Sequence, residues 1–175
     1  MQPLIPEFLD FVQKADQGAV IKGVWPLNRM HRFAVMLHTD EGVVEAVLQF
    51  GRHGKLRTLS GELSADLAVT CQRCLQPMQY PLQTQLSLAL VKDDDQAESL
   101  PEMFEPLLLE AEAVNLAEVI EDELLLALPL VLVHEHDCSD FLQQQAQRQK
   151  QDAVKAAEQK VKNNPFAVLK DLRKE

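Results

Sequence analysis

Two runs of alternating apolar and polar residues flank a Cys-x-x-Cys segment, and this arrangement constrains the fold more than any other feature of the chain. In residues 79–90 apolar side chains stand at every second position against Gln and Ser, and residues 63–71 repeat the pattern. Because successive side chains of a β-strand point to opposite faces, each run predicts a strand with one wet face. We therefore predict an antiparallel hairpin whose short connection contains Cys71 and Cys74.

The remaining patterns predict a mixed architecture. Further extended segments are expected between Pro, Asn, Asp and Gly residues, at 19–25, 32–38, 43–50 and 106–110, with a charged loop before the last of them. Helices are expected at 6–15 and at 115–128, where Asn115 caps the first turn and Pro129 stops the helix. The fold class is therefore α+β, with residues 1–140 forming one domain. We expect an antiparallel sheet, either open or curled into a barrel-like form, with the acidic helix 115–128 packed on it.

Residues 141–175 differ from this domain in composition and predict a basic arm. Residues 141–162 are rich in Gln, Ala and Lys and carry few large apolar side chains, which is typical of a solvated helix or a flexible arm. The arm ends in a short amphipathic motif that contains Pro165, Phe166 and Leu169. Either this motif packs back onto the domain, or it docks into a groove of a partner, and we favour docking.

Charge is divided unevenly along the chain and indicates the kind of partner. Residues 93–140 carry fifteen Asp and Glu and no Lys or Arg, whereas residues 1–92 have a net charge of +1 and residues 141–175 of +4. A chain with a net charge of −10 is a poor non-specific nucleic-acid binder. The acidic stretch instead predicts a basic partner, such as a ribosomal protein, with Glu121, Asp122 and Glu123 as candidate binding residues.

The same carboxylates give little support to catalysis. No His, Lys or Arg lies near Glu118, Glu121 and Asp122 in the sequence to tune a general acid or base. No phosphate-binding glycine loop, nucleophile elbow or zinc-protease motif is present in the sequence either. We therefore expect that the protein is not an enzyme, and that the acidic helix face is either solvated or used for binding.

The Cys-x-x-Cys pair leaves two interpretations open. Cys71 and Cys74 are spaced to share one tetrahedral zinc, and Cys138 with His134 or His136 would complete a set of three thiolates and one imidazole. In the other interpretation the thiols only pack at the hairpin, and the sequence alone favours this second one slightly. A redox role is disfavoured because the pair follows a strand and does not open a helix.

Basic residues of the domain are candidates for contact with RNA backbone, and Arg73 is the most interesting because it lies between the two cysteines. Ordinary solubilisation of loops also explains these residues, and it is the interpretation that we prefer. The single Trp25 and the single Tyr80 do not make the stacking platform of a single-stranded RNA binder.

No stretch is long and apolar enough to span a bilayer, no basic leader precedes an apolar run, and three cysteines do not form a secreted disulfide framework. We therefore expect the cytoplasm as the compartment, with neither a membrane nor a small molecule as partner.

Three segments together resemble the bacterial YceD family of large ribosomal RNA subunit accumulation proteins. They are Thr70–Pro77 (TCQRCLQP), Val119–Pro129 (VIEDELLLALP) with His134 after it, and Asn164–Leu169 (NPFAVL); the stretch QAESLPEMFEP is similar as well. The resemblance covers most of the chain from about residue 60 onward. It implies a bacterial ribosome-biogenesis role in the synthesis, processing or stability of 23S ribosomal RNA, with no catalytic residue. The partners implied are large-subunit ribosomal RNA, a basic ribosomal protein or an assembly intermediate.

Other branches of the family carry the Cys-x-x-Cys pair with additional cysteines near the C-terminal end, which implies a four-thiolate metal site there. This chain has only Cys138, with His134 and His136, in the corresponding place, and the departure puts zinc in question for it. Two alternative functions remain beside a non-catalytic role in 23S ribosomal RNA accumulation: an acidic chaperone-like adaptor for a basic ribosomal protein, and, less favoured, an RNA-processing enzyme.

Overall fold

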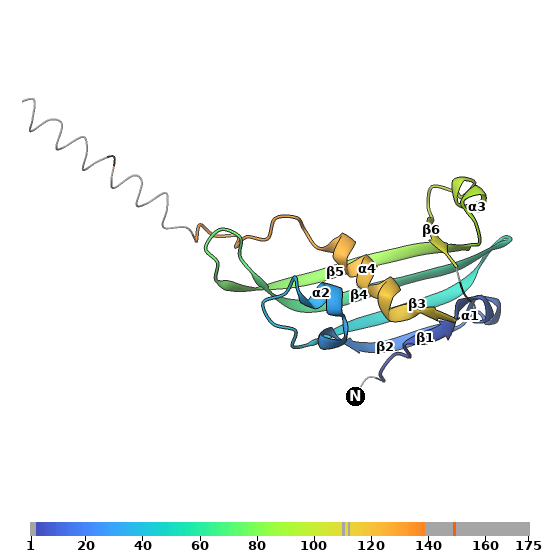
Figure 1. Ribbon diagram of the computed structural model, residues 1–175, viewed down its shortest axis with the longest axis horizontal. Coiled ribbons are helices and arrows are strands. Elements are labelled where there is room, and N and C mark those ends of the chain that lie inside the picture. Colours follow the sequence, from blue (N-terminus) through green and yellow to red (C-terminus); the bar gives the residue numbers. More distant parts are fainter. Residues whose placement is uncertain (1–2, 110, 112, 139–148, 150–175) are drawn as a thin grey trace, which may run out of the picture. The chain divides into compact units, whose positions relative to one another are not determined.

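A computed structural model describes residues 3–109, 111, 113–138 and 149 of the 175-residue chain. The chain divides into two compact units, residues 1–133 and residues 134–175. The first unit contains every strand described below and the helices that pack on them (Figure 1). The C-terminal motif with Pro165, Phe166 and Leu169 lies outside the described residues, as does nearly all of the arm that the sequence predicts.

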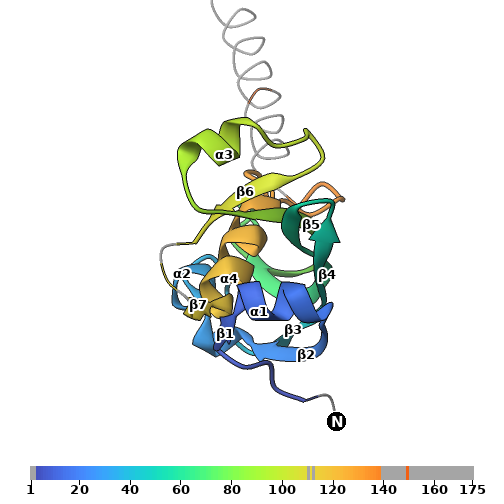
Figure 2. The ribbon, with the colours of Figure 1, turned by 90° about the vertical axis from the view of Figure 1, so that its right-hand side faces the viewer.

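A five-stranded sheet with the order β2-β3-β4-β5-β6 is the centre of the first unit. Its strands are β2 (Val20–Pro26), β3 (Val43–His53), β4 (Leu56–Thr70), β5 (Pro77–Val91) and β6 (Glu105–Leu108). The first four pair antiparallel, whereas β5 and β6 run parallel. The sheet curves around the helices (Figure 2). Its outer strands β2 and β6 do not pair with each other, so in the described part of the chain the sheet is open and not a closed barrel.

The hairpin predicted from the two alternating runs is confirmed, and its strands are longer than the patterns indicate. β4 pairs with β5 from Arg57 opposite Leu90 to Thr70 opposite Pro77. The buried positions of the two strands share one face, as in the pairs of Ala65 with Leu82 and of Leu59 with Leu88. Because the polar positions share the other face, one side of the sheet receives the helices and the other side stays open to solvent.

Helices α1 (Phe11–Gln17) and α4 (Leu116–Ala127) cover the apolar face (Figure 2). α1 packs on β3 and β4, where the rings of Phe11 and Phe50 meet edge to face with 5.2 Å between centroids. α4 packs against β5. The side chain of Asn115 accepts a hydrogen bond from the backbone N–H of Ala117 and donates one to Glu118, so the predicted N-terminal cap of this helix is confirmed.

Three of the sequence predictions need correction. Residues 32–38, expected as a strand, begin instead with helix α2 (His31–Ala34), after the 3₁₀ turn η1 (Leu27–Arg29). The helix expected at 6–15 is split: strand β1 (Phe8–Asp10) pairs with the distant strand β7 (Ala113–Asn115), and Asp10 then caps α1. The charged loop after β5 contains the short helix α3 (Asp94–Glu98). In each case a tertiary partner or a local cap prevails over the periodicity of apolar residues.

Candidate functional site

The connection between β4 and β5 is a tight turn that carries both cysteines of the Cys-x-x-Cys pair. The backbone N–H of Cys71 donates to the carbonyl of Gln76, and that of Leu75 donates to the carbonyl of Cys71. Leu75 has a φ of +61°, and among the described residues other than glycine it is the one with a positive φ. This left-handed conformation is strained for leucine and is the one that glycine adopts easily, so the surrounding contacts impose the shape of the turn.

The segment that follows α4 is bound to this turn by two hydrogen bonds. The backbone N–H of Gln72 donates to the carbonyl of Leu132 over 2.8 Å, and its side-chain amide donates to the carbonyl of Leu130 over 3.2 Å. Both bonds lie within the first compact unit. Because His134 is only two residues beyond Leu132, the covalent chain itself brings this histidine to the neighbourhood of the two cysteines.

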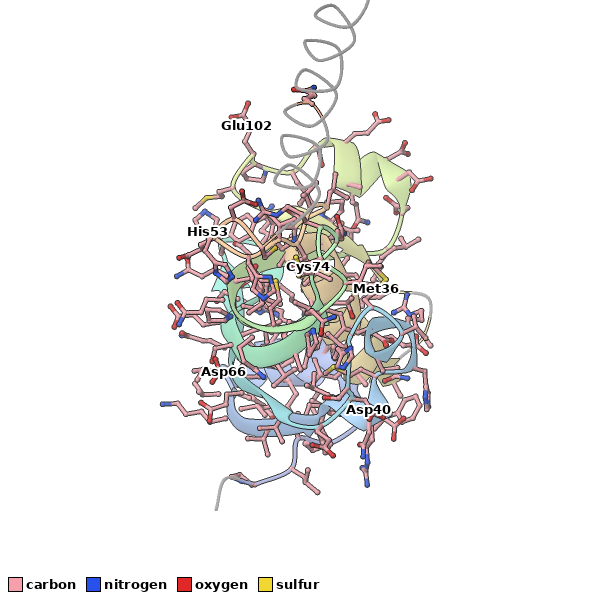
Figure 3. All side chains as sticks on the ribbon, turned by 90° about the vertical axis from the view of Figure 1, so that its left-hand side faces the viewer. Met36, Asp40, His53, Asp66, Cys74 and Glu102 are labelled. Atoms are coloured by element: carbon pink, nitrogen blue, oxygen red, sulfur yellow. The ribbon has the colours of Figure 1, made fainter. Side chains whose placement is uncertain are left out.

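Cys71, Cys74, His134 and Cys138 form a group in which one ligand atom from each residue lies within 4.8 Å of the others. Cys71 is buried and the other three are half-buried. Figure 3 looks onto the end of the molecule that carries Cys74. Three thiolates and one imidazole are a complete donor set for a structural tetrahedral zinc, so the residues present fit this ion chemically.

The structure also separates the two histidines that the sequence leaves as alternatives. His134 belongs to the group of four, whereas His136 does not. The ring of His136 lies against that of His134 instead, with 4.9 Å between centroids and an interplanar angle of 36°. Chain spacing could not make this choice, because both histidines are within four residues of Cys138.

Glu121 of the acidic helix is buried and bound to α2. Its carboxylate accepts hydrogen bonds from the backbone N–H groups of Arg32 and Phe33, over 2.6 and 2.9 Å, and from Nε of Arg32 over 3.0 Å. A second guanidinium nitrogen of Arg32 donates to the exposed Asp122 over 2.7 Å. Glu121 therefore satisfies the open N–H groups at the start of α2, a role that the sequence does not reveal because the two helices are almost ninety residues apart.

Glu123 lies on α4 two residues after Glu121, and its surroundings differ from those of Glu121. Its side chain is half-buried, and burial raises the pKa of its carboxyl group above the usual value, as do the neighbouring charges of Glu105 and Asp122. Negative charge is therefore concentrated around Glu123, with Glu105 of β6 and Asp122 as its charged neighbours. Of the three acidic residues that the sequence predicts for partner binding, Asp122 and Glu123 reach solvent and Glu121 does not.

A second acidic surface lies on the open face of the sheet. Three hollows follow one another on β3, β4 and β5. The first two share Ser64 and Gln83, and the second and third share Glu62 and Gln85. Glu45 and Asp66 line the hollow nearest the ends of the strands, and the side chains of Gln85 and Glu62 are hydrogen-bonded across two strands. Alternation in the sequence predicts a polar face here, but only the pairing of strands brings the carboxylates together.

The basic residues of the domain do not gather on one surface. Arg52 and Arg57, at the tip of the β3–β4 hairpin, both donate to the carboxylate of Asp16. These two guanidinium groups lower the pKa of Asp16 to about 2. Arg73 is exposed within the Cys-x-x-Cys turn.

In the described part of the chain, no helix is both long enough and apolar enough to cross a membrane.

Comparison with known proteins agrees with the resemblance. The family model described as large ribosomal RNA subunit accumulation protein YceD matches residues 59–173, a range that includes the Cys-x-x-Cys turn, α4 and the histidine segment. The chain is 32% identical over 172 residues to the large ribosomal RNA subunit accumulation protein YceD of Haemophilus influenzae, a match that covers 97% of this chain and 96% of that protein. No solved structure matches. The chain therefore belongs to the YceD family.

Proposed function

We propose that this protein supports the accumulation of large-subunit (23S) ribosomal RNA in the bacterial cytoplasm by binding an assembly component, without turning over a substrate. The observation that carries the proposal is the similarity, over almost the full length of both chains, to a Haemophilus influenzae protein named for the accumulation of the large ribosomal RNA subunit. The match covers 97% of this chain, so the sheet, the acidic helix and the Cys-x-x-Cys turn all lie within it.

The placement of the acidic residues supports binding over catalysis. A general base needs a carboxylate that can reach a substrate proton. Glu121 is 6% exposed, and its two oxygens accept hydrogen bonds from Arg32 and Phe33, so it is committed to the packing of α4 on α2. Asp122 is exposed while paired with Arg32, and the half-buried Glu123 reaches solvent, so negative charge at this part of α4 can attract a partner.

A second candidate function, an adaptor for a basic ribosomal protein, is favoured by the local excess of negative charge. The charges of Glu105 and Asp122 repel that of Glu123, and the open face of the sheet adds Glu45, Glu62 and Asp66. A cationic partner would relieve this repulsion on binding. The two candidates differ in the molecule contacted first: ribosomal RNA or assembly intermediate in the first, free ribosomal protein in the second.

We further propose that Cys71, Cys74, His134 and Cys138 bind a structural zinc ion. The donor set supports this. The hydrogen bond from the N–H of Leu75 to the carbonyl of Cys71 closes the turn that contains both cysteines. Because all four positions of a tetrahedral ion would be filled by protein, the ion would stabilise the fold and would not activate water. Its effect on function would then be indirect, through the position of the segment that follows α4.

The zinc proposal is tested by elemental analysis of the full chain purified without chelator. We expect about one zinc per chain, and loss of zinc with a fall in Tm for the Cys71→Ser/Cys74→Ser variant, because metal binding contributes directly to folding free energy. His136→Ala is the matched control, since His136 lies beside the ligand group but outside it, and this variant should retain its zinc. A wild-type protein without zinc, whose cysteine variant melts at the same temperature, would reduce the four residues to packing groups.

The functional proposal is tested in cells that lack the chromosomal copy and express tagged protein. Expression should restore the ratio of 23S to 16S ribosomal RNA, and the tag should recover large-subunit components. Binding through exposed carboxylates should weaken steeply with salt, because such charges are screened beyond about 8 Å at physiological ionic strength. Recovery of one free ribosomal protein without RNA would select the adaptor function. An unchanged 23S ratio in cells without the protein would refute both.

A further inference from the structure

The basic residues of the domain as a whole are spread over several surfaces, but four of them meet at the tip of the β3–β4 hairpin. Residues 46–61 contain no Asp or Glu, and within this stretch lie Arg52, His53, Lys55 and Arg57. We call these four residues the basic hairpin tip. The stretch contrasts with residues 93–140, which carry fifteen carboxylates and no Lys or Arg.

Strand pairing holds the basic hairpin tip together. Arg52 lies directly opposite Arg57 in the register of β3 with β4. Gly54 and Lys55 form the two-residue turn beyond the last pair of the ladder, and Gly54 has a φ of +61°, which glycine adopts without strain. In the described part of the chain, a Cβ atom placed on Gly54 would meet nothing within 4 Å. The turn therefore stands clear of its surroundings at the end of the sheet and is open to a partner (Figure 1).

One carboxylate orders the two arginines without neutralising the tip. Asp16 of α1 accepts hydrogen bonds from Nε and Nη2 of Arg52, over 2.9 and 2.6 Å, and from the same two atoms of Arg57, over 2.8 and 3.1 Å. Nη1 of each guanidinium makes no hydrogen bond with the residues that the structure describes. Together with Lys55 the cluster holds three cations and one carboxylate, a net charge of +2 at neutral pH.

This geometry suits the phosphate groups of a nucleic acid. Guanidinium groups that are bound along one edge keep their remaining N–H groups for a second acceptor, and ordering them before binding lowers the entropy cost of the contact. Arginine and lysine are the principal donors to nucleic-acid phosphates. Because the three cations belong to one hairpin tip at the end of the sheet, they can contact neighbouring phosphates of the same strand.

The acidic face of the sheet lies beyond the range of these cations. Glu62 is the first carboxylate along β4 after Arg57, and five residues of extended chain place it roughly 17 Å away. Exposed charges are screened beyond about 8 Å at physiological ionic strength, so this face repels a polyanion at the tip only weakly. The carboxylates of α3, which packs on β5 and β6, favour an approach of the polyanion from the side of α1, which packs on β3 and β4 (Figure 2).

We propose that the basic hairpin tip binds the phosphate backbone of ribosomal RNA. The inference rests on the proposed function, to which it adds the surface that contacts RNA and the group that this surface recognises. Contacts to phosphate position a protein on RNA without reading its sequence. The protein can then contact phosphate with the tip and a basic protein with its carboxylates, as binding to an assembly intermediate of RNA and protein requires.

The test measures binding of the full chain to 23S ribosomal RNA transcribed in vitro, over a range of salt concentrations. Wild type should bind in the micromolar range at about 50 mM salt, and log Kd should rise linearly with the logarithm of the salt concentration. Arg52→Gln/Lys55→Gln removes two of the three cations. This variant should bind roughly tenfold more weakly at about 50 mM salt, and its slope should be shallower by about 1.5.

Lys22→Gln/Arg29→Gln is the matched control, because it changes the net charge of the chain equally at two exposed positions outside the tip. It should bind RNA like wild type. Both double variants should keep the wild-type Tm within about 1 °C, since the side chains removed are exposed and Asp16 retains its bonds to Arg57. Equal weakening by the two variants would show that net charge alone governs binding. That result, or a wild type without measurable affinity for the RNA, would overturn the proposal.

A second measurement separates this inference from the proposed function. In cells without the chromosomal copy, wild type and Lys22→Gln/Arg29→Gln should restore the ratio of 23S to 16S ribosomal RNA, and Arg52→Gln/Lys55→Gln should not. Full restoration by the tip variant would overturn the inference and leave the proposed function intact. A ratio that does not change when the protein is lost would refute the proposed function, and the measured affinities would then decide whether the tip binds RNA.

Discussion

Two clusters of arginine and carboxylate attach helices to the rest of this protein, and they differ in what surrounds the carboxylate. Glu121 of α4 is 6% exposed and accepts hydrogen bonds from the backbone N–H groups of Arg32 and Phe33 besides the guanidinium. Asp16 of α1 accepts hydrogen bonds from Arg52 and Arg57 and remains well exposed, with 39% of its side chain accessible.

The difference lies in what would be left behind if either carboxylate were removed. Without Glu121, the N–H of Phe33 would be buried without an acceptor, since Phe33 is fully buried. Without Asp16, both arginines could turn to water, because about half of the Arg52 side chain and a third of the Arg57 side chain are already accessible. The number of ion pairs is therefore a poor guide to stability. A better guide is whether the polar groups that a carboxylate satisfies are buried.

The largest effect is expected for Glu121→Ala. Two backbone N–H groups lose their acceptor and Arg32 loses a charged partner, which should lower the free energy of unfolding by about 2–3 kcal/mol. For a domain of this size the Tm should fall by roughly 4–12 °C. Thermal unfolding followed by circular dichroism measures the change.

Asp122→Ala is the matched control for Glu121→Ala, because Asp122 binds the same arginine from an exposed position. It should lower the free energy of unfolding by less than about 1 kcal/mol. Equal effects of the two substitutions would show that the arginine charge matters and the capping of α2 does not, and the comparison between buried and exposed carboxylates would then fail.

A smaller effect of opposite sign is expected for Glu123→Gln. Burial and the charges of Glu105 and Asp122 raise the pKa of this carboxyl group in the folded protein. The ionised group therefore destabilises the folded state, and the penalty is present at neutral pH and disappears below about pH 4, where the carboxyl is protonated in both states. The variant should melt about 1 °C above wild type at pH 7 and at the wild-type temperature at pH 3.5.

The opposite result for Glu123→Gln would also be informative. A Glu123→Gln variant that melts below wild type at pH 7 would mean that Glu123 makes a favourable interaction outweighing the repulsion. The charge excess at this part of α4 would then be compensated within the protein, and the argument for a basic partner would lose one of its supports.

Local patterns predicted the parts of this fold that depend on neighbouring residues. The alternation in 63–71 and 79–90 predicted the β4–β5 hairpin, and Asn115 with Pro129 predicted α4 within one residue at its start. Segment 32–38 was wrongly predicted as a strand, because α2 is capped by Glu121, which is distant in the sequence. A cap supplied from another helix leaves no local signal, so this error could not have been avoided by a closer reading of residues 32–38.

The candidate metal group likewise has one part that local sequence patterns predict and another that only the structure reveals. The spacing of Cys71 and Cys74 predicted that both would lie at one turn, and their place between two alternating runs predicted a hairpin. The choice of His134 over His136 needed the three-dimensional structure, in which His134 belongs to the group with the three cysteines. The hydrogen bonds from Gln72 to Leu130 and Leu132 bring the preceding segment to the turn. The acidic surface of the open face was likewise hidden, since Glu45, Glu62 and Asp66 meet only through strand pairing.

The smallest effect, and the one that completes the comparison, is expected for Asp16→Asn. Hydrogen bonds from Arg57 and Arg52 lower the pKa of Asp16 in the folded protein to about 2 from an ordinary value of 3.8. A carboxylate with a lowered folded pKa stabilises the folded state above its unfolded pKa, and the contribution is lost as the pH falls from about 4 to about 2. At pH 7 solvent screening should keep the difference in Tm between variant and wild type below about 1 °C. As the pH decreases from 4 to 2 the two melting temperatures should converge, and added salt at pH 7 should narrow the gap as well.

Glu121→Ala should by contrast keep most of its deficit at high salt, because buried hydrogen bonds to backbone N–H groups are screened far less than exposed charges. A variant at position 16 that loses as much stability as Glu121→Ala would show that the exposed cluster at the hairpin tip is as important to the fold as the buried one.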